Sequence, residues 1–208
     1  MRYKVILEPT DKVWLYALMV PYSKNQGIGI ARDFRLVSRT PIFQRFSYEV
    51  MQFKKISLDA NLPFWLRQEM LKLPEKGNAT AHQMAQQWRK FYASDEAYIQ
   101  AVLAWFRKSN FYYTLEPPLL GENRIDDFLF KTKRGFCEHY SSAFTFLLRA
   151  AGIPARVVVG YQGGEWSPTG DSWQVRQMDA HAWVEAWLPN KGWTLLDPTG
   201  AIAPERIE

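Results

Sequence analysis

The last third of the chain places one amphipathic helix ahead of several short strand-like segments, and this order limits the possible folds more than any other feature. Residues 143–151 carry apolar side chains at helical spacing, and Gly152 and Pro154 end the helix. Four strand-like segments follow, at residues 155–161, 172–177, 180–188 and 193–197. A helix that leads into consecutive strands predicts an α+β fold, with the helix packed on an antiparallel sheet.

The earlier part of the chain predicts a β-rich start and a helical middle. Strand-like patterns lie at residues 3–7, 13–20, 34–37 and 43–53. Helical patterns follow at residues 63–71, 80–92 and 95–108, and Ser94 is placed to cap the last of them. Residues 111–123 contain two consecutive prolines and predict an irregular connection, which either lines a cleft or is a plain linker. We therefore predict an N-terminal β-rich subdomain at residues 1–58 and a second part at residues 59–208 that joins the helices to the α+β core.

Composition excludes several classes of function. The 208 residues carry a net charge of +5 but no dense block of lysine and arginine, so we expect no nucleic-acid binding. The longest apolar run, residues 13–22, has about half the length that a bilayer requires. No secretory signal pattern opens the chain, so the chain as given is expected to be soluble; whether it is a segment of a larger protein stays open. One cysteine and three separated histidines give no zinc-ligand spacing, and we predict no metal and no cofactor.

Cys137 is the only cysteine, and it lies where a loop turns into the amphipathic helix. Gly135, two residues earlier, gives the backbone the freedom for a sharp turn. The free N–H groups and the dipole at a helix N-terminus favour an ionised thiol, and they could also hold the oxyanion of a tetrahedral intermediate. Position therefore predicts a nucleophile, against the alternative of a small buried hydrophobic residue.

A thiol nucleophile needs a base, and the chain offers three histidines. His82 lies in a polar helix, and His139 is two residues past Cys137 on a helix, so its side chain is expected to point away from the thiol. His181 opens a strand-like segment and is the predicted base. The alternative for His181 is a hydrogen-bonded structural histidine at the start of a strand.

Asp197 is the predicted partner of that histidine. The five residues 188–192 suit a hairpin loop between two strands. If Trp187 pairs with Trp193, then His181 becomes the diagonal neighbour of Asp197 on the same face, at about 7–8 Å between Cα atoms. A carboxylate there could orient the imidazole ring toward the thiol. The alternative for Asp197 is a turn residue ahead of a proline.

Four segments also occur in an order that resembles a known family. They read RGFCEHYSSA, AGIPAR, DAHAW and WTLLDPT, at residues 134–143, 151–156, 179–183 and 193–199. Over roughly residues 95–200 the chain resembles the transglutaminase-like superfamily. The first segment, the run EPPLLG at residues 116–121 and the β-rich start are similar to the periplasmic domain of bacterial TgpA-type inner-membrane transglutaminases.

This resemblance implies a papain-like α+β fold in which Cys137 accepts an acyl group, His181 is the base and Asp197 orients it. It also implies a periplasmic location, with membrane anchoring through segments absent from this chain. Its expected substrates are protein or peptide glutamines and amines, with cell-wall peptides as one class. Glu138 stands where animal transglutaminases have tryptophan, so their substrate preference is not carried over. The chain has no EF-hand-like acidic loop, and calcium dependence is not expected either.

Three readings of the function follow. The first is acyl transfer from a glutamine carboxamide to an amine through a thioester. The second is an amidase or peptidase of the same fold, in which water resolves the thioester, and the third is a binding module that kept the fold without the chemistry. Trp183, Tyr161 and Glu138 are candidate substrate-binding residues; core packing is the alternative for the two aromatic side chains.

Overall fold

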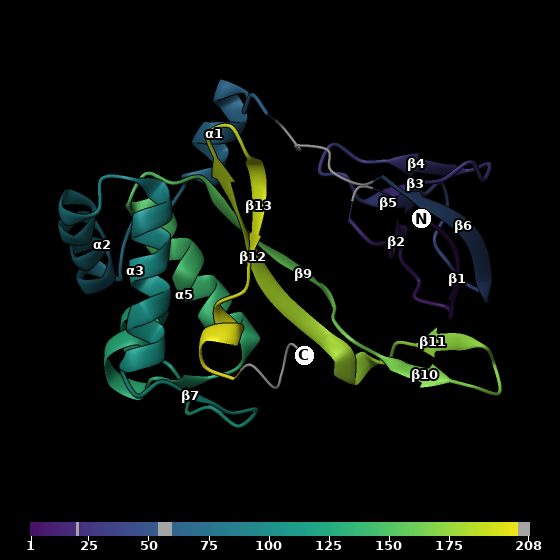
Figure 1. Cartoon of the computed structure of the whole chain (residues 1–208). Helices are drawn as coiled ribbons and strands as arrows, with labels where there is room; N and C mark the ends of the chain where they lie inside the picture. The colour runs from purple at the N-terminus through teal and green to yellow at the C-terminus, as the bar shows by residue number, and fades with distance from the viewer. Residues whose placement is uncertain (20, 54–59, 204–208) are drawn as a thin grey trace. The chain divides into compact units, whose positions relative to one another are not determined.

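The computed structural model describes residues 1–19, 21–53 and 60–203. The chain divides into two compact units, Met1–Ile56 and Ser57–Glu208 (Figure 1). The boundary predicted between residues 58 and 59 lies outside the described residues.

The first unit consists of two small antiparallel sheets. One has the order β1-β6-β3 and the other the order β2-β5-β4. The strands are β1 (Arg2–Leu7), β2 (Trp14–Leu15), β3 (Pro21–Tyr22), β4 (Ile28–Ile30), β5 (Leu36–Ser38) and β6 (Phe46–Gln52). Their shared core consists of Leu15, Leu36, Ile42, Tyr48 and Val50, none more than 5% exposed.

The strand predicted at residues 13–20 is wrong beyond Leu15, and position 20 lies outside the described residues. The backbone N–H of Leu18 donates to the hydroxyl of Tyr3 at 2.7 Å, in place of a bond to a neighbouring strand. This side-chain acceptor competes with the sheet for the backbone, and it comes from another strand, so the local pattern does not reveal it.

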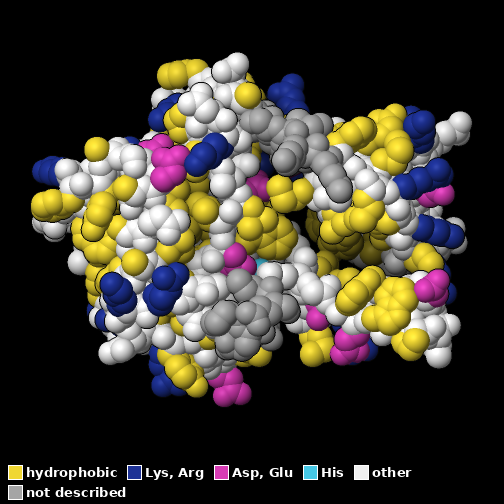
Figure 2. All heavy atoms as spheres, in the orientation of Figure 1, with side chains coloured by type: hydrophobic (Ala, Val, Ile, Leu, Met, Phe, Trp, Pro, Cys, Tyr) yellow, Lys and Arg dark blue, Asp and Glu magenta, His cyan; other side chains and the backbone are white. Residues whose placement is uncertain are grey.

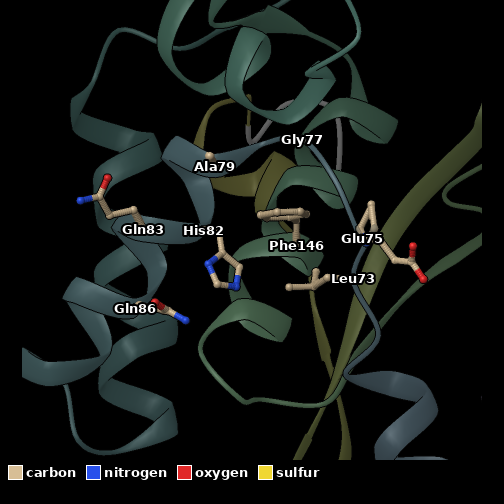
Figure 3. A pocket seen from close by; sticks show the side chains of 9 residues that line it. Leu73, Glu75, Gly77, Ala79, His82, Gln83, Gln86 and Phe146 are labelled. Atoms are coloured by element: carbon tan, nitrogen blue, oxygen red, sulfur yellow. The ribbon is translucent and has the colours of Figure 1, made fainter.

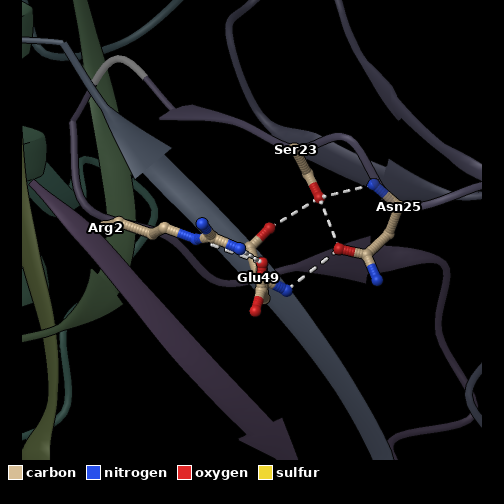
Figure 4. A network of polar contacts seen from close by, with 4 residues as sticks. All are labelled: Arg2, Ser23, Asn25 and Glu49. Carbon is tan, nitrogen blue, oxygen red and sulfur yellow. Dashed lines mark hydrogen bonds and ion pairs between the residues drawn. The ribbon is translucent and has the colours of Figure 1, made fainter.

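A polar network ties the loop after β3 to β6 (Figure 4). The hydroxyl of Ser23 donates to the carbonyl oxygen of Glu49 at 2.6 Å, and the side-chain oxygen of Asn25 accepts from the Glu49 N–H at 3.0 Å. Arg2 pairs with the Glu49 carboxylate, and both side chains are more than half exposed. An exposed ion pair contributes little stability. The two hydrogen bonds between the β6 backbone and the side chains of Ser23 and Asn25 fix the course of the loop.

Helices form most of the first half of the second unit. They are α1 (Phe64–Met70), α2 (Ala79–Phe91), α3 (Asp95–Lys108), the short α4 (Arg124–Asp126) with the π-helical turn η1 (Asp127–Thr132), and α5 (Cys137–Ala150). The predicted cap of α3 is confirmed, because the hydroxyl of Ser94 accepts from the Ala97 N–H at 3.1 Å. None of the described helices is long and apolar enough to cross a membrane.

The segment around α4 was not predicted, and long-range capping explains it. The side-chain oxygen of Asn78, at the start of α2, accepts from the N–H groups of Ile125 and Asp126 at 3.0 and 3.2 Å. In return, the Asp126 carboxylate accepts from the N–H groups of Thr80 and Ala81 at 3.1 and 2.7 Å. Each helix start therefore satisfies the orphan donors of the other, across about 45 residues of sequence.

The second half of the unit is a three-stranded antiparallel sheet with the order β13-β12-β9 and a hairpin at its end. Its strands and turns are β9 (Ala155–Tyr161), β10 (Glu165–Ser167), β11 (Ser172–Gln174), the 3₁₀ turn η2 (Gln177–Asp179), β12 (Ala180–Leu188), β13 (Gly192–Leu196) and the 3₁₀ turn η3 (Pro198–Ala201). The strand predicted at residues 172–177 therefore stops at Gln174, and β10 was not predicted.

Helix α5 is the centre of this unit and packs against β9 and β12 (Figure 1). Tyr140, Phe144, Leu147 and Leu148 are fully buried. Burial of each leucine or phenylalanine side chain contributes about 1.5–3 kcal/mol. Aromatic rings from the preceding segments surround the first turns of α5. The ring centroids of Phe106 in α3, Phe111 after α3 and Phe128 in η1 all lie within about 6 Å of the Tyr140 centroid. The predicted α+β arrangement, a helix bearing the cysteine on an antiparallel sheet, is confirmed. Its consequence is a rigidly held Cys137.

Candidate active site

Cys137 is the first residue of α5, as predicted, and it is 8% exposed. The preceding Phe136 has extended backbone angles, and its carbonyl oxygen accepts from the N–H of His139 at 2.9 Å. The thiol therefore lies at the positive end of a 14-residue helix. Such an end stabilises a negatively charged sulfur.

The turn ahead of Cys137 is shaped by His139. A side chain at Gly135 would place its Cβ 2.6 Å from the Cβ and Cγ atoms of His139, so only glycine fits there. The Phe136 N–H donates to Nδ1 of His139 at 3.4 Å, and the imidazole packs against the rings of Phe136 and Phe128. Burial lowers the pKa of His139 and outweighs the opposing charge of Glu138, which favours the neutral ring that this bond requires. His139 thus holds the turn, a role that the sequence did not indicate.

The strand register predicted for the hairpin is confirmed. Trp187 pairs with Trp193 and Glu185 with Leu195, which brings His181 next to Asp197. Nε2 of His181 lies 2.7 Å from Oδ2 of Asp197, in a hydrogen bond to which the ring contributes the proton. The other carboxylate oxygen accepts from the Thr199 N–H at 2.9 Å. Asp197 therefore has both features that the sequence suggested, a turn residue and a partner of the histidine.

The electrostatics of His181 differ from those of an ordinary histidine. Burial lowers its pKa, but hydrogen bonds to Asp197 and Cys137, together with the negative charges of both partners, outweigh burial and raise the pKa to about 9. Nε2 faces Asp197, so Nδ1 is left for the sulfur. At neutral pH this arrangement favours a protonated imidazole between the Asp197 carboxylate and the Cys137 sulfur.

A buried hydrogen bond joins the helix of Cys137 to the strand of His181. The hydroxyl of Ser141, one turn along α5, donates to the carbonyl oxygen of Ala182 at 2.8 Å, and both residues are almost completely buried. The bond fixes the spacing between the two elements that carry the thiol and the imidazole. This bond could not be predicted from the sequence, because a serine one turn past Cys137 is equally compatible with a solvent-facing position.

The three candidate substrate-binding residues have different surroundings. The indole of Trp183 lies beside the His181 ring, with 6.2 Å between centroids and 25° between planes. The hydroxyl of Tyr161 donates to the side chain of Gln177 at 2.9 Å, and Glu138 is exposed in the first turn of α5. Of the three, the structure brings Trp183 into contact with the predicted base; substrate contact stays a prediction for each.

Exposed aromatic side chains mark the hairpin that extends from the sheet. Figure 2 shows hydrophobic side chains over this hairpin, where Trp166 and Trp173 face each other across the strands and are 49% and 66% exposed. Their rings meet edge to face at 5.8 Å. The contact stabilises a two-stranded ribbon that would otherwise be marginal.

A surface cavity of about 390 Å³ lies elsewhere in the unit, between α2 and the segment that follows α1 (Figure 3). Its lining includes Leu73, Glu75, His82, Gln83, Gln86 and Phe146. Phe146 is nine residues along α5 from Cys137, which is about 13 Å of helix. Cys137 is not among the residues that line the cavity, so the cavity is separate from the thiol. In the part of the chain that the structure describes, no three histidine, cysteine or acidic side chains are grouped as metal ligands.

Comparison with known proteins agrees with this geometry. Residues 82–198 match a family model described as the transglutaminase-like superfamily, and residues 1–54 match one described as the TgpA N-terminal domain. A crystal structure of the periplasmic domain of TgpA from Pseudomonas aeruginosa superposes with a TM-score of 0.97 at 45% sequence identity, over 100% of this chain and 72% of that one. These matches confirm both the predicted resemblance and the predicted fold.

Two curated relatives are much longer than this chain. The protein-glutamine gamma-glutamyltransferase of Pseudomonas aeruginosa is 45% identical over 208 residues, which is 100% of this chain and 31% of that protein. The uncharacterized protein YebA of Bacillus subtilis is 30% identical over 187 residues, 86% of this chain and 25% of that protein. The chain thus spans about a third or less of the length of either relative.

Proposed function

The chain belongs to the transglutaminase-like superfamily, and from this premise we propose that it transfers the acyl group of a glutamine side chain to an amine through a thioester on Cys137. The observation that carries the proposal is the buried arrangement of Cys137, His181 and Asp197, in which the imidazole interacts with a thiol on one side and a carboxylate on the other. Nucleophile, acid–base group and orienting group are the three components that covalent acyl transfer requires.

In the first half of the reaction, the Cys137 thiolate attacks the carbonyl carbon of the glutamine carboxamide. The tetrahedral oxyanion forms beside the N-terminus of α5, where backbone N–H groups and the helix dipole stabilise negative charge. His181 gives its proton to the nitrogen, the carbon–nitrogen bond breaks, and ammonia leaves. Cys137 is then a thioester, and His181 is neutral.

In the second half, an amine such as a lysine side chain attacks the thioester carbonyl. Neutral His181 accepts a proton from the amine nitrogen, and the carbon–sulfur bond breaks. The product, now joined by an isopeptide bond, leaves, and the Cys137 thiolate is restored. Asp197 keeps the same ring nitrogen engaged in both halves, so the other nitrogen stays aimed at the reacting atoms. If water replaces the amine, the same residues carry out an amidase reaction.

The natural setting belongs to the same proposal. The curated relative from Pseudomonas aeruginosa has the name of a glutamine acyltransferase, and the related crystal structure is of a periplasmic domain. We infer a periplasmic location for this domain, anchored through parts of a longer protein. Protein or peptide glutamines and amines, cell-wall peptides among them, are the proposed substrates, with Trp183, Tyr161 and Glu138 as candidate contacts.

The proposal is tested by measuring ammonia release from a glutamine peptide with and without a primary amine. We expect the amine to be incorporated into the peptide in proportion to the ammonia released, because the amine competes with water for the thioester. Mass spectrometry of the peptide distinguishes an isopeptide product from a glutamate product. Ammonia release with only glutamate formed would favour the amidase, and no release at all would favour the binding module.

The pKa of His181 predicts the alkaline limit of the first half-reaction. The raised pKa favours the protonated ring, which donates its proton to the leaving nitrogen. This proton donor is present at pH 7–8 and is lost as the pH rises through about 9. Single-turnover ammonia release should therefore fall with a midpoint near pH 9. A midpoint near pH 6.5, the value of an unperturbed histidine, would contradict the ion-paired arrangement.

A further inference from the structure

Trp183 occupies a space that the neighbouring strand leaves open for it. Gly160 on β9 pairs directly with His181 on β12, and Trp183 lies two residues along β12 on the same face. A Cβ atom on Gly160 would lie 2.7 Å from Cη2 and 3.3 Å from Cζ3 of the indole. The outer ring of Trp183 therefore covers the backbone opposite His181, and only glycine at position 160 permits this.

The imidazole of His181 is consequently confined from three directions. Asp197 holds it from the β13 side, the thiol lies at its other nitrogen, and the Trp183 indole lies against it at 25° to its plane. Asp197 and Cys137 each hold one ring nitrogen, but neither covers a face of the ring. The indole supplies that contact and limits rotation of the imidazole out of the plane of its two hydrogen bonds.

The indole itself is not optimised for stability. Its Nε1 atom is buried, and it has no hydrogen-bond partner among the described residues. An unsatisfied buried donor costs about 1–3 kcal/mol, which phenylalanine at this position would avoid. Gly160, the next-to-last residue of β9, adds a further entropic cost. Two unfavourable features thus coincide beside His181, which points to a role other than stabilising the sheet.

We propose that Trp183 is a positioning residue that holds the His181 imidazole in line with Cys137, and that Gly160 is required because it admits the indole. This proposal rests on the proposed function, because kcat and KM are measured for the same acyl-transfer reaction. It gives the indole of Trp183 a role beside the base, and this role replaces substrate contact as the one proposed for this residue. Loss of the indole should therefore lower kcat and leave KM unchanged.

The test is a double-mutant cycle with Gly160→Ala and Trp183→Phe. Phenylalanine lacks the outer ring atoms that a Cβ at position 160 would meet. We expect Gly160→Ala alone to lower kcat about tenfold at constant KM, since small misplacements of a catalytic group have large effects on rate. In the Trp183→Phe background the same substitution should lower kcat less than twofold. Trp183→Phe alone should lower kcat about threefold, with an unfolding midpoint equal to or above that of the wild type.

Alkylation of Cys137 by iodoacetamide gives a readout that is independent of any natural substrate. Because Cys137 is the only cysteine, labelling reports on one site. Gly160→Ala should slow labelling at pH 6.5 about tenfold, and the loss should again disappear in the Trp183→Phe background. Gly29→Ala is the matched control, because a Cβ there meets only Val37, at 3.9 Å; its kcat and labelling rate should equal those of the wild type.

Each contrary outcome overturns the proposal. A rise in KM at constant kcat would assign the indole to substrate binding, and a tenfold loss that persists in the Trp183→Phe background would show that Gly160 does not act through the indole. Lowered unfolding midpoints with unchanged labelling rates and kcat would show that Gly160 and Trp183 only pack against each other and do not position His181. If Gly160→Ala fails to fold, the labelling rates of Trp183→Phe and Trp183→Leu decide, and both equal to wild type would refute the role. A wild-type chain that is labelled as expected but incorporates no amine would refute the transferase function alone.

Discussion

We expect Cys137→Ala to abolish ammonia release from glutamine substrates, a loss of roughly 10⁶-fold, because enzymes that act through a covalent intermediate lose about this factor without their nucleophile. The change removes one sulfur atom from a site that is 8% exposed at the first position of α5. Alanine is a good helix former, so α5 should remain intact. The measurement is the rate of ammonia release at saturating peptide.

Cys137→Ser is the control for shape. Its hydroxyl nearly preserves the volume of the thiol but is a far weaker nucleophile near neutral pH, so it should be almost as inactive as Cys137→Ala. Both variants should unfold within a few degrees of the wild type, and neither should be alkylated by iodoacetamide. Ammonia release within tenfold of the wild type in either variant would rule out Cys137 as the nucleophile.

The sequence was most informative where its signals are local. Loop length predicted a hairpin, and the register assumed for it, Trp187 opposite Trp193, is the register observed. This register brings His181 and Asp197 together. The cap at Ser94 and the start of α5 at Cys137 also follow from neighbouring residues. In each case the partners lie within one turn or one hairpin, so few alternative conformations compete.

Long-range contacts account for what the sequence did not predict. The side chains of Asn78 and Asp126 each accept hydrogen bonds from the N-terminal N–H groups of the other's helix, and α4 forms in a segment with no helical pattern of its own. The bond from Ser141 to Ala182 spans 41 residues and joins helix to sheet. In sequence, these three polar side chains cannot be told apart from ones that face water, since Asn, Asp and Ser are common at turns and surfaces.

The same distinction applies to the candidate site. Trp183 could be predicted as a residue near His181 because the two lie on one face of a strand, two residues apart. Its orientation could not, because it depends on the absence of a side chain at Gly160, on a different strand. His139 likewise shapes the turn of Cys137 only because Gly135 leaves room for its ring. Glycines that leave room for a neighbouring ring are recognisable in three dimensions, but in sequence they resemble turn or strand-end glycines.

Asp197→Asn is expected to lower single-turnover ammonia release by roughly 10³–10⁴-fold, the loss found when an orienting carboxylate in a catalytic triad becomes an amide. The amide keeps the shape of the side chain, and its oxygen can still accept from the Thr199 N–H. The amide has one acceptor oxygen where the carboxylate has two. This oxygen cannot accept strong hydrogen bonds from both the Thr199 N–H and the Nε2 proton of His181. The ring then loses its orientation and the negative charge that raises its pKa.

Two readouts separate this effect from general damage. The pKa of His181 should fall, so the alkaline limit of ammonia release should move below the wild-type value near pH 9. Glu185→Gln is the matched control, because Glu185 is a buried carboxylate on β12 whose ion-pair partner among the described residues is Arg156, at 2.7 Å, and not His181. Breaking that pair should cost about 3–5 kcal/mol of stability while leaving the pH profile in place below the unfolding temperature. An Asp197→Asn variant with a wild-type alkaline limit would show that the carboxylate holds the backbone turn and does not tune the imidazole.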